Sequence, residues 1–204
     1  MDETVELAMF PLGSVLLPAM PLPLRVFEDR YLQMLQDILA HQPAEFGVVL
    51  IERGQEVGGG EHRFPVGTVA RVVELGPGDG FVTVGAQGTD RFEVVEWLPD
   101  DPYPRARVRR LPELRWSEEW APERDEVEAY VRQTLARASE FSDQRFPATI
   151  ELADEPVAAL WQLAAITPVG PLDQLVLLRC DSVPDLLAAV LAATMDANDL
   201  FPRP

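Results

Sequence analysis

The fold of this chain is decided by the stretch Phe10-Pro-Leu-Gly-Ser-Val-Leu-Leu-Pro-Ala-Met-Pro-Leu-Pro-Leu24. Prolines interrupt it at positions 11, 18, 21 and 23. Proline fixes φ and has no backbone N–H, so it excludes a helix and a central strand. We therefore expect extended backbone with turns at the edge of a sheet. The apolar residues 5–10 just before it predict a strand that ends at Pro11.

The segment that follows predicts one amphipathic helix, from Phe27 to Leu39. One helical face carries apolar residues at the i, i+3, i+4 and i+7 positions, namely Tyr31, Met34, Leu35 and Ile38. Acidic residues at positions 28 and 29 lie in its first turn, where the helix dipole favours negative charge.

Short apolar runs predict the strands of a small antiparallel barrel. They are residues 46–51, 66–75, 81–84, 91–97 and 105–109. The run Gly76-Pro-Gly-Asp-Gly80 is typical of a hairpin, because glycine adopts positive φ without steric cost. Closely spaced strands with tight turns indicate a β-barrel on which the helix of residues 27–39 packs.

The period of the hydrophobic pattern changes at Pro112 from about two residues to about 3.6. Beyond it the pattern predicts four helices, over residues 127–138, 157–164 and 172–178 and from Ser182 through Thr194. The run Ser182-Val-Pro-Asp185 is a capping box with Asp in place of the usual Glu. We therefore predict an α+β chain, with a β-barrel over residues 1–112 and a C-terminal helical bundle over residues 113–204. Residues 122–199 should be almost wholly helical.

Two tryptophans lie at the joint between these parts. Trp116 and Trp120 are four residues apart, just before the first of the four helices. Burial of side chains this large stabilises a fold by roughly 1.5–3 kcal/mol or more each. We expect at least one of them to pack against the barrel or against the next helix near Trp161, which would dock the bundle on the barrel. The alternative is that both lie half-exposed on a surface turn.

The chain is strongly acidic, with a formal net charge of -17 over 204 residues. Residues 1–112 carry 10 Arg and 17 acidic residues, net -7, and residues 113–204 carry 7 Arg and 17 acidic residues, net -10. Both halves therefore repel a phosphate backbone, which argues against nucleic acid as a partner. A hydrophobic content of 47% with 25% charged residues is typical of a globular protein.

The residue counts exclude several kinds of chemistry. The chain has no Lys, so a Walker A loop, a Ser–Lys dyad and a Lys Schiff base are excluded. Cys180 is the one cysteine, which excludes an internal disulfide and a cysteine-cluster metal site. His41 and His62 lie in no metal-ligand spacing, and we interpret Cys180 as a small apolar residue rather than a nucleophile. We predict no catalytic residue, no metal and no cofactor.

Three further stretches bear on location and partners. Gly58-Gly-Gly60 lacks the strand–loop–helix context of a phosphate cradle, and we interpret it as a flexible hairpin tip. The acidic start and the short apolar run at residues 186–193 argue against a secretory signal and a membrane span, so we expect a cytoplasmic protein.

One basic cluster interrupts the acidic sequence: Arg105, Arg107, Arg109, Arg110 and Arg115. It predicts either a contact for an anion or nucleic acid, or ion pairs with the acid-rich residues 113–128. We favour ion pairs, because the opposite charges are adjacent in the chain.

Four blocks of sequence occur in the order in which one known protein family has them. They are residues 10–31, ending in Val26-Phe-Glu-Asp-Arg-Tyr31, then Phe46-Gly-Val-Val-Leu-Ile51, Val66-Gly-Thr-Val-Ala-Arg71 and Val84-Gly-Ala-Gln-Gly-Thr-Asp-Arg-Phe92. Together they resemble the N-terminal substrate-binding domain of Lon proteases, well over residues 6–110 and more loosely through 169–178 and 182–187. The resemblance implies a PUA-like small β-barrel with one packed helix, followed by a helical bundle. It is nearest to short bacterial proteins made of this domain alone, without ATPase or peptidase domains.

The resemblance implies a non-enzymatic polypeptide-binding module, and the family places no catalytic residue in this domain. Its expected partners are polypeptide segments or misfolded proteins, with a separate protease as a candidate second partner; the sequence leaves the oligomeric state open. The expected surface is the proline-rich edge plus the first helix: Leu17, Pro18, Met20, Pro21, Leu22, Phe27 and Tyr31. Such an edge accepts an extended segment by strand addition; alternatively, these residues simply pack the helix onto the barrel.

Two other functions are considered. RNA binding is the first, since PUA-like barrels also occur in RNA-binding proteins, and the charge argues against it. The second is an enzyme acting on a small ligand between barrel and bundle, for which no titratable groups are arranged.

Overall fold

The computed structural model describes residues 4–51, 63–141 and 145–201. The chain divides into two compact units, Met1–Pro112 and Glu113–Pro204. The glycine run at 58–60 and His62 lie outside the described residues, so the interpretation of that run as a hairpin tip stays a prediction.

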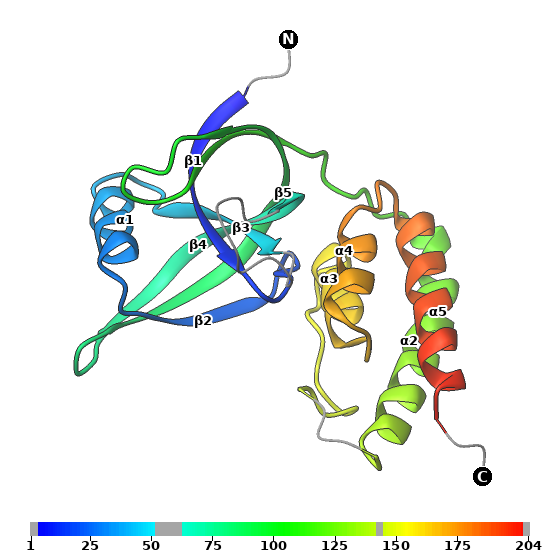
Figure 1. Cartoon of the computed structure of the whole chain (residues 1–204). Helices are drawn as coiled ribbons and strands as arrows, with labels where there is room; N and C mark the ends of the chain where they lie inside the picture. Colours follow the sequence, from blue (N-terminus) through cyan, green and yellow to red (C-terminus); the bar gives the residue numbers. More distant parts are fainter. Residues whose placement is uncertain (1–3, 52–62, 142–144, 202–204) are drawn as a thin grey trace. The chain divides into compact units, whose positions relative to one another are not determined.

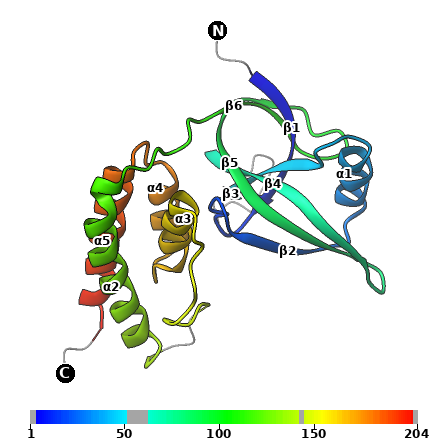
Figure 2. The same ribbon diagram turned by 180° about the vertical axis from the view of Figure 1, so that it is seen from behind.

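The first unit has a mixed α+β fold (Figure 1). Its elements are β1 (Thr4–Leu12), β2 (Pro21–Val26), α1 (Asp29–Leu39), β3 (Glu45–Ile51), β4 (Arg63–Pro77), β5 (Val82–Leu98) and β6 (Arg105–Arg110). The six strands found among the described residues lie in the order β2-β5-β4-β3-β1-β6, and β5 also pairs with β6. Contrary to the expected antiparallel arrangement, β1 and β3 pair in parallel. Strands β4 and β5 run side by side as a long antiparallel arm (Figure 2).

Two short strands were expected at 81–84 and 91–97. The structure instead has one continuous strand there, β5. Gly85 and Gly88 weaken the strand pattern between the two runs. In the fold, a Cβ atom on Gly88 would lie 2.5 Å from the carbonyl oxygen of Leu17, so this glycine marks a close approach of two backbones rather than a turn. Bulges in the pairing with β4 absorb the changes of register along the strand.

The predicted hairpin at 76–80 and the predicted first helix are both confirmed. At the hairpin, Gly80 has a φ of 77°, and the N–H of Gly78 donates to the carbonyl oxygen of Phe81 at 2.9 Å. The helix begins two residues later than expected, at Asp29, because Glu28 still has an extended backbone with φ -75° and ψ 132°.

Met9 and Phe92 form the centre of the core of the first unit. They are fully buried together with Val49, Val69, Ala106 and Val108. Two glycines on neighbouring strands provide the space for them. An added Cβ atom would lie 2.6 Å from the sulfur of Met9 at Gly47, and 2.7 Å from the ring of Phe92 at Gly67.

Helix α1 buries three residues of its predicted apolar face, Tyr31, Met34 and Leu35, whereas Ile38 is half-buried. Tyr31 stacks on Phe10 of β1 with ring centroids 4.2 Å apart. A polar contact joins the helix to the loop that precedes β6. The hydroxyl of Tyr103 donates to Oδ2 of Asp37 at 2.8 Å. Burial, together with this hydrogen bond, raises the pKa of Tyr103 to about 12.

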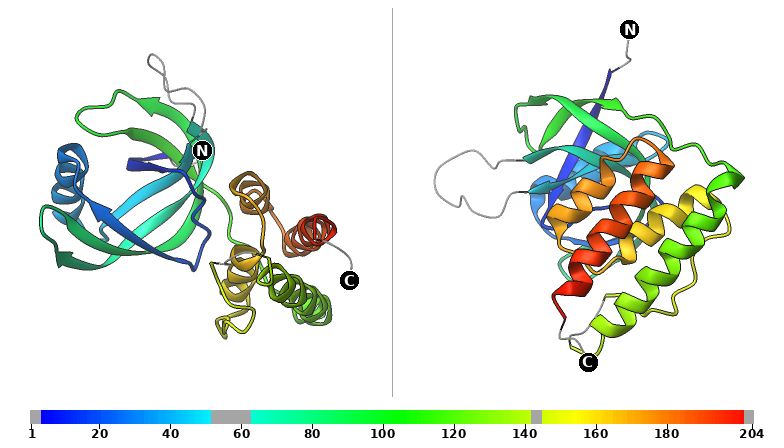
Figure 3. Two further views of the ribbon diagram at one scale, coloured as in Figure 1. Left: turned by 60° about the horizontal axis from the view of Figure 1, so that its bottom comes forward. Right: turned by 90° about the vertical axis from the view of Figure 1, so that its right-hand side faces the viewer.

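The second unit is helical over most of its described length (Figure 3). After a short 3-10 helix, η1 (Glu118–Trp120), come α2 (Ala121–Ala138), α3 (Pro156–Ile166), α4 (Pro171–Leu178) and α5 (Val183–Asp199). The four predicted helices are confirmed. Helices α2 and α5 lie side by side. Arg137 joins their ends, donating to Oδ1 of Asn198 at 2.9 Å and to the carbonyl oxygen of Phe201 at 3.2 Å.

The predicted cap of α5 is confirmed. Oγ of Ser182 accepts the N–H of Asp185 at 3.2 Å, and its hydroxyl donates to the carboxylate of Asp185 at 2.6 Å. The cap satisfies one of the N–H groups that the first turn of a helix leaves without an intrahelical acceptor.

Residues 122–199 are less helical than expected, since residues 139–141 and 145–155 contain no helix. Side chains of the neighbouring helices supply hydrogen bonds to this segment. Arg132 of α2 donates to the carbonyl oxygen of Ala148 at 2.6 Å, and Oε1 of Gln162 of α3 accepts the N–H of Ala153 at 2.6 Å. These bonds hold an irregular backbone that the hydrophobic pattern alone does not specify.

Trp116 and Trp120 contact each other edge to face, with ring centroids 6.3 Å apart. Both are half-buried, and Nε1 of Trp116 donates to Oε1 of Glu118 at 3.0 Å. The expectation that one of them docks the helical part on the strand part stays a prediction.

Candidate functional site

Five of the seven residues predicted to form the binding surface are buried: Leu17, Pro18, Met20, Leu22 and Tyr31. Pro21 and Phe27 are exposed, and Phe27 is 66% exposed. These five buried residues pack the proline-rich stretch and α1 into the first unit. This agrees with the alternative interpretation, in which they serve packing instead of binding. Their side chains are not available to a partner in this structure.

Hydrogen bonds fasten the proline-rich stretch to the sheet. The hydroxyl of Thr68 donates to the carbonyl oxygen of Leu16 at 2.6 Å. The N–H of Gly88 donates to the carbonyl oxygen of Met20, and the N–H of Ala19 donates to that of Gly88, both at 2.9 Å. Thr68 and Gly88 both belong to the family-like blocks, so these blocks hold the fold instead of forming a reactive site.

Strand β2 is the first strand in the sheet order, and its ladder is with β5. Its burial alternates: Pro21, Pro23 and Arg25 are exposed, whereas Leu22 and Val26 are buried. The two prolines have no N–H to offer to an added strand, and proline on an outer strand is a known protection against edge-to-edge pairing. The expected mode of strand addition at this edge is therefore disfavoured.

The exposed face of β2, β5 and β4 carries a band of apolar groups. Pro23 pairs with Gly85 of β5. A Cβ atom on Gly85 would lie 3.4 Å from Cβ of Glu74 and 3.8 Å from Cγ2 of Val73, both on β4. Val73 lies where the β4–β5 register shifts and is 64% exposed. We call this surface, made by Pro21, Pro23, Gly85 and Val73, the proline face.

Four of the five arginines of the basic cluster form ion pairs, as favoured, but with partners other than those expected. The partners are acids of neighbouring strands rather than the acid-rich residues 113–128. The pairs are Arg105–Glu6 at 3.2 Å, Arg107–Glu96 at 2.6 Å, Arg109–Glu93 at 2.5 Å and Arg110–Glu45 at 3.1 Å. Chain adjacency is misleading here because the sheet brings β1, β3 and β5 next to β6 or within reach of its side chains. Cations already paired with carboxylates do not form a phosphate-binding surface, which removes the support for RNA binding.

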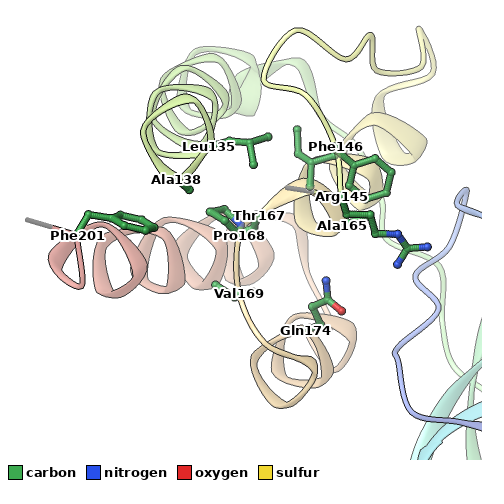
Figure 4. A pocket seen from close by; sticks show the side chains of 11 residues that line it. Leu135, Ala138, Arg145, Phe146, Ala165, Thr167, Pro168, Val169, Gln174 and Phe201 are labelled. Carbon is green, nitrogen blue, oxygen red and sulfur yellow. The ribbon is translucent and has the colours of Figure 1, made fainter. Parts of the chain in front are cut away.

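A pocket of about 400 Å³ lies within the second unit (Figure 4). Its lining comes from α2, α3, α4, the segment between α2 and α3, and the segments that follow α3 and α5. Leu135 and Ala138 contribute from α2, Gln174 from α4 and Phe201 from the chain after α5. The sequence pattern did not single out this pocket, because its residues are far apart in the chain.

Side chains of metal-ligating types and the one cysteine lie among the described residues. None of their His, Cys, Asp and Glu side chains gather into a group of three or more that could hold a metal ion. The thiol sulfur of Cys180 lies 3.7 Å from the carbonyl oxygen of Val176, one turn back in the chain. Among the helices described, none is long and apolar enough to cross a membrane.

The architecture is shared with solved Lon N-terminal domains. A Lon N-terminal domain protein from Xanthomonas campestris aligns with a TM-score of 0.62 at 24% identity, covering 97% of this chain and 99% of that chain. The N-terminal domain of Mycobacterium avium complex Lon protease aligns with a TM-score of 0.66 at 15% identity, covering 94% and 99%. At these identities the likeness shows the fold alone.

Sequence comparison identifies the family. The model of the ATP-dependent protease La (LON) substrate-binding domain matches residues 6–194, so the chain belongs to this family. It is 31% identical over 184 residues to Lon protease of Anaeromyxobacter dehalogenans and 32% identical over 184 residues to Lon protease 2 of Myxococcus xanthus. These alignments cover 88% of this chain and 20% and 21% of the relatives, so the chain spans about a fifth of their length. The resemblance seen in the four blocks is thereby confirmed.

Proposed function

We propose that this chain is a non-enzymatic polypeptide-binding module that works without ATPase or peptidase activity of its own. The observation that carries the proposal is the family match over residues 6–194, which is to a substrate-binding domain. Absence of Lys, and with it of a phosphate-binding Walker lysine, supports the non-enzymatic part. Its clients are unfolded or misfolded polypeptide segments in the cytoplasm, and a separately encoded protease is the second partner.

The proposed client surface is the proline face together with Phe27, which follows β2. It retains the exposed members of the predicted surface, Pro21 and Phe27, and adds Pro23 and Val73. Apolar side chains that stay exposed in a folded protein lower the free energy of a complex when a client covers them. Because prolines protect the β2 edge, the client lies on the face of the sheet and contacts side chains instead of extending the ladder.

The finer architecture is part of the proposal. The additional β5–β6 pairing supports a PUA-like β-barrel over residues 1–112, because it joins β6, at one end of the strand order, to β5, the second strand from the other end. The contacts of α2 with α3 and α5 support a helical bundle over residues 113–204. Docking of the bundle on the barrel predicts one cooperative denaturant transition for both parts, and two independent transitions would contradict it.

Client binding is tested with matched surface substitutions. The probe is a fluorescently labelled, permanently unfolded test protein whose anisotropy reports binding. Val73→Asp places a charge on the proline face, whereas Val95→Asp places the same charge on β5 at a residue that is 56% exposed and outside that face. We expect Val73→Asp to weaken binding about tenfold or more, equivalent to about 1.4 kcal/mol, and Val95→Asp to bind like the unmodified chain. Equal affinities of the two variants, or no binding by the unmodified chain, would contradict the proposal.

A further inference from the structure

The pocket of the second unit has an apolar part and a polar part. Its apolar lining includes Leu135, Ala138, Phe146, Ile166, Pro168 and Phe201. Its polar side chains are Arg145, Thr167 and Gln174. The hydroxyl of Thr167 donates to the carbonyl oxygen of Leu163 at 3.0 Å and is thus engaged within the chain. Arg145 and Gln174 are left as the groups that can contact a ligand.

Arg145 stands out in a chain with twice as many acidic as basic residues. Among the described residues no carboxylate pairs with it; its guanidinium carbon lies 5.2 Å from the ring centroid of Phe146. The side-chain amide of Gln174 likewise has no hydrogen-bond partner among the described residues. Figure 4 shows Arg145 and Gln174 toward one end of the pocket and Ala138 and Phe201 toward the other. The pocket is therefore amphipathic along its length.

We infer that this pocket binds the C-terminal residue of a client polypeptide, with its apolar side chain in the pocket and its α-carboxylate on Arg145. The inference rests on the proposed polypeptide-binding function and adds a second contact to it. A guanidinium binds a carboxylate through two parallel N–H groups, and an amide side chain such as that of Gln174 both donates to and accepts from a peptide group. A chain end presents all three features together: an apolar side chain, a carboxylate and a peptide bond.

The volume of the pocket and the net charge of the second unit both favour a chain end as the ligand. Pockets for small ligands have volumes of about 300–1,000 Å³, and 400 Å³ is near the lower limit. Such a volume admits the end of a chain and excludes a long extended segment. Residues 113–204 carry a net charge of -10 (7 Arg against 17 acidic residues), which repels polyanions but tolerates the single charge of a carboxylate beside Arg145.

The test compares two peptides that differ at one group. Both are ten residues long, carry fluorescein at the N-terminus and end in Leu-Ala-Leu; one has a free C-terminal carboxylate and the other a C-terminal amide. Fluorescence anisotropy gives the Kd of each. We expect the unmodified chain to bind the carboxylate form about tenfold more tightly, the ratio that about 1.4 kcal/mol produces.

Two variants with equal charge separate the role of Arg145 from general electrostatics. Arg145→Gln should abolish the preference for the carboxylate. Arg179→Gln removes the same charge from an exposed residue that follows α4 and does not line the pocket, and it should retain the preference. Both positions are exposed, and circular dichroism checks that both variants are folded. Gln174→Ala should weaken binding of the carboxylate peptide and leave any binding of decanoate, which lacks a peptide group, unchanged.

Several results would overturn the inference. They are equal affinities of the unmodified chain for the two peptides, loss of the preference in Arg179→Gln, and binding of decanoate without binding of the carboxylate peptide. Val73→Asp distinguishes this failure from failure of the proposed function. If it weakens binding of the unfolded protein while the two peptides bind equally, the pocket inference alone is wrong.

Discussion

Gly67 is a position where the fold leaves almost no space for a side chain. It lies on β4 between Val49 of β3 and Phe92 of β5, with which it is in register. A Cβ atom there would meet the carbonyl oxygen of Val48 and would lie 2.8 Å from Cγ1 of Val49. Because the first of these contacts is backbone, no change of rotamer relieves it. In Gly67→Ala the paired strands must therefore separate locally.

The expected cost follows from two opposing effects. Overpacking of a well-packed core costs about 1–3 kcal/mol. The lower conformational entropy of unfolded alanine offsets about 0.4–1 kcal/mol of this. Gly85→Ala is the matched control, because its added Cβ atom would lie 3.4 Å from the nearest atom, Cβ of Glu74, an ordinary contact. It should gain only the entropic stabilisation. Because this gain is common to both variants, they should differ by the overpacking cost alone, about 1–3 kcal/mol.

Urea denaturation followed by circular dichroism and tryptophan fluorescence measures this difference. The midpoint of Gly67→Ala should fall with an unchanged m-value, and that of Gly85→Ala should stay or rise. A free energy of unfolding for Gly67→Ala within about 0.5 kcal/mol of the control would refute the packing described around Phe92.

Three other substitutions test separate contacts. Tyr103→Phe should cost about 1–2 kcal/mol at neutral pH. Because the pKa of Tyr103 rises from 10.0 in the unfolded chain to about 12 in the folded one, the stabilisation is complete below pH 10 and is lost as the pH rises through 12. The difference in free energy of unfolding between the two proteins should therefore close in that window, and a constant difference would contradict the assignment. Ser182→Ala should cost about 1 kcal/mol in thermal or urea melts by removing the cap of α5, while Ser182→Asn should retain most of the stability. Thr134→Val should stabilise the second unit by about 1 kcal/mol, since the hydroxyl oxygen of Thr134 is buried without a partner among the described residues; a loss of stability in urea would show that the hydroxyl is satisfied.

Local signals in the sequence predict much of the fold. The helical face of α1 and the cap at Ser182 depend on residues within one or two turns of each other, and the structure confirms both. The hairpin at Gly80 is equally local, since it needs a residue that adopts positive φ. For such elements, the interactions that decide the structure lie within the short segment of chain that forms the element.

Features that depend on distant strands were predicted incorrectly or not at all. Gly88 weakens a local strand pattern, yet β5 continues through it because Leu17, far away in the chain, approaches it. Arg107 has acids near it in sequence, yet its partner is Glu96 across the ladder. The exposed residues of the predicted surface could not be separated from the buried ones, because Leu17 and Phe27 are equally apolar and only the fold decides which of them reaches solvent.

The three ladders of β5 have a consequence for the order in which the first unit opens. Strand β5 pairs with β2, β4 and β6, so none of these strands can detach without exposing part of it. Opening β5 itself requires breaking all three ladders at once, which amounts to unfolding the sheet. In native-state hydrogen exchange, its amide protons that are bonded within these ladders should therefore exchange only through global unfolding, while the outer positions of β2 exchange through smaller fluctuations.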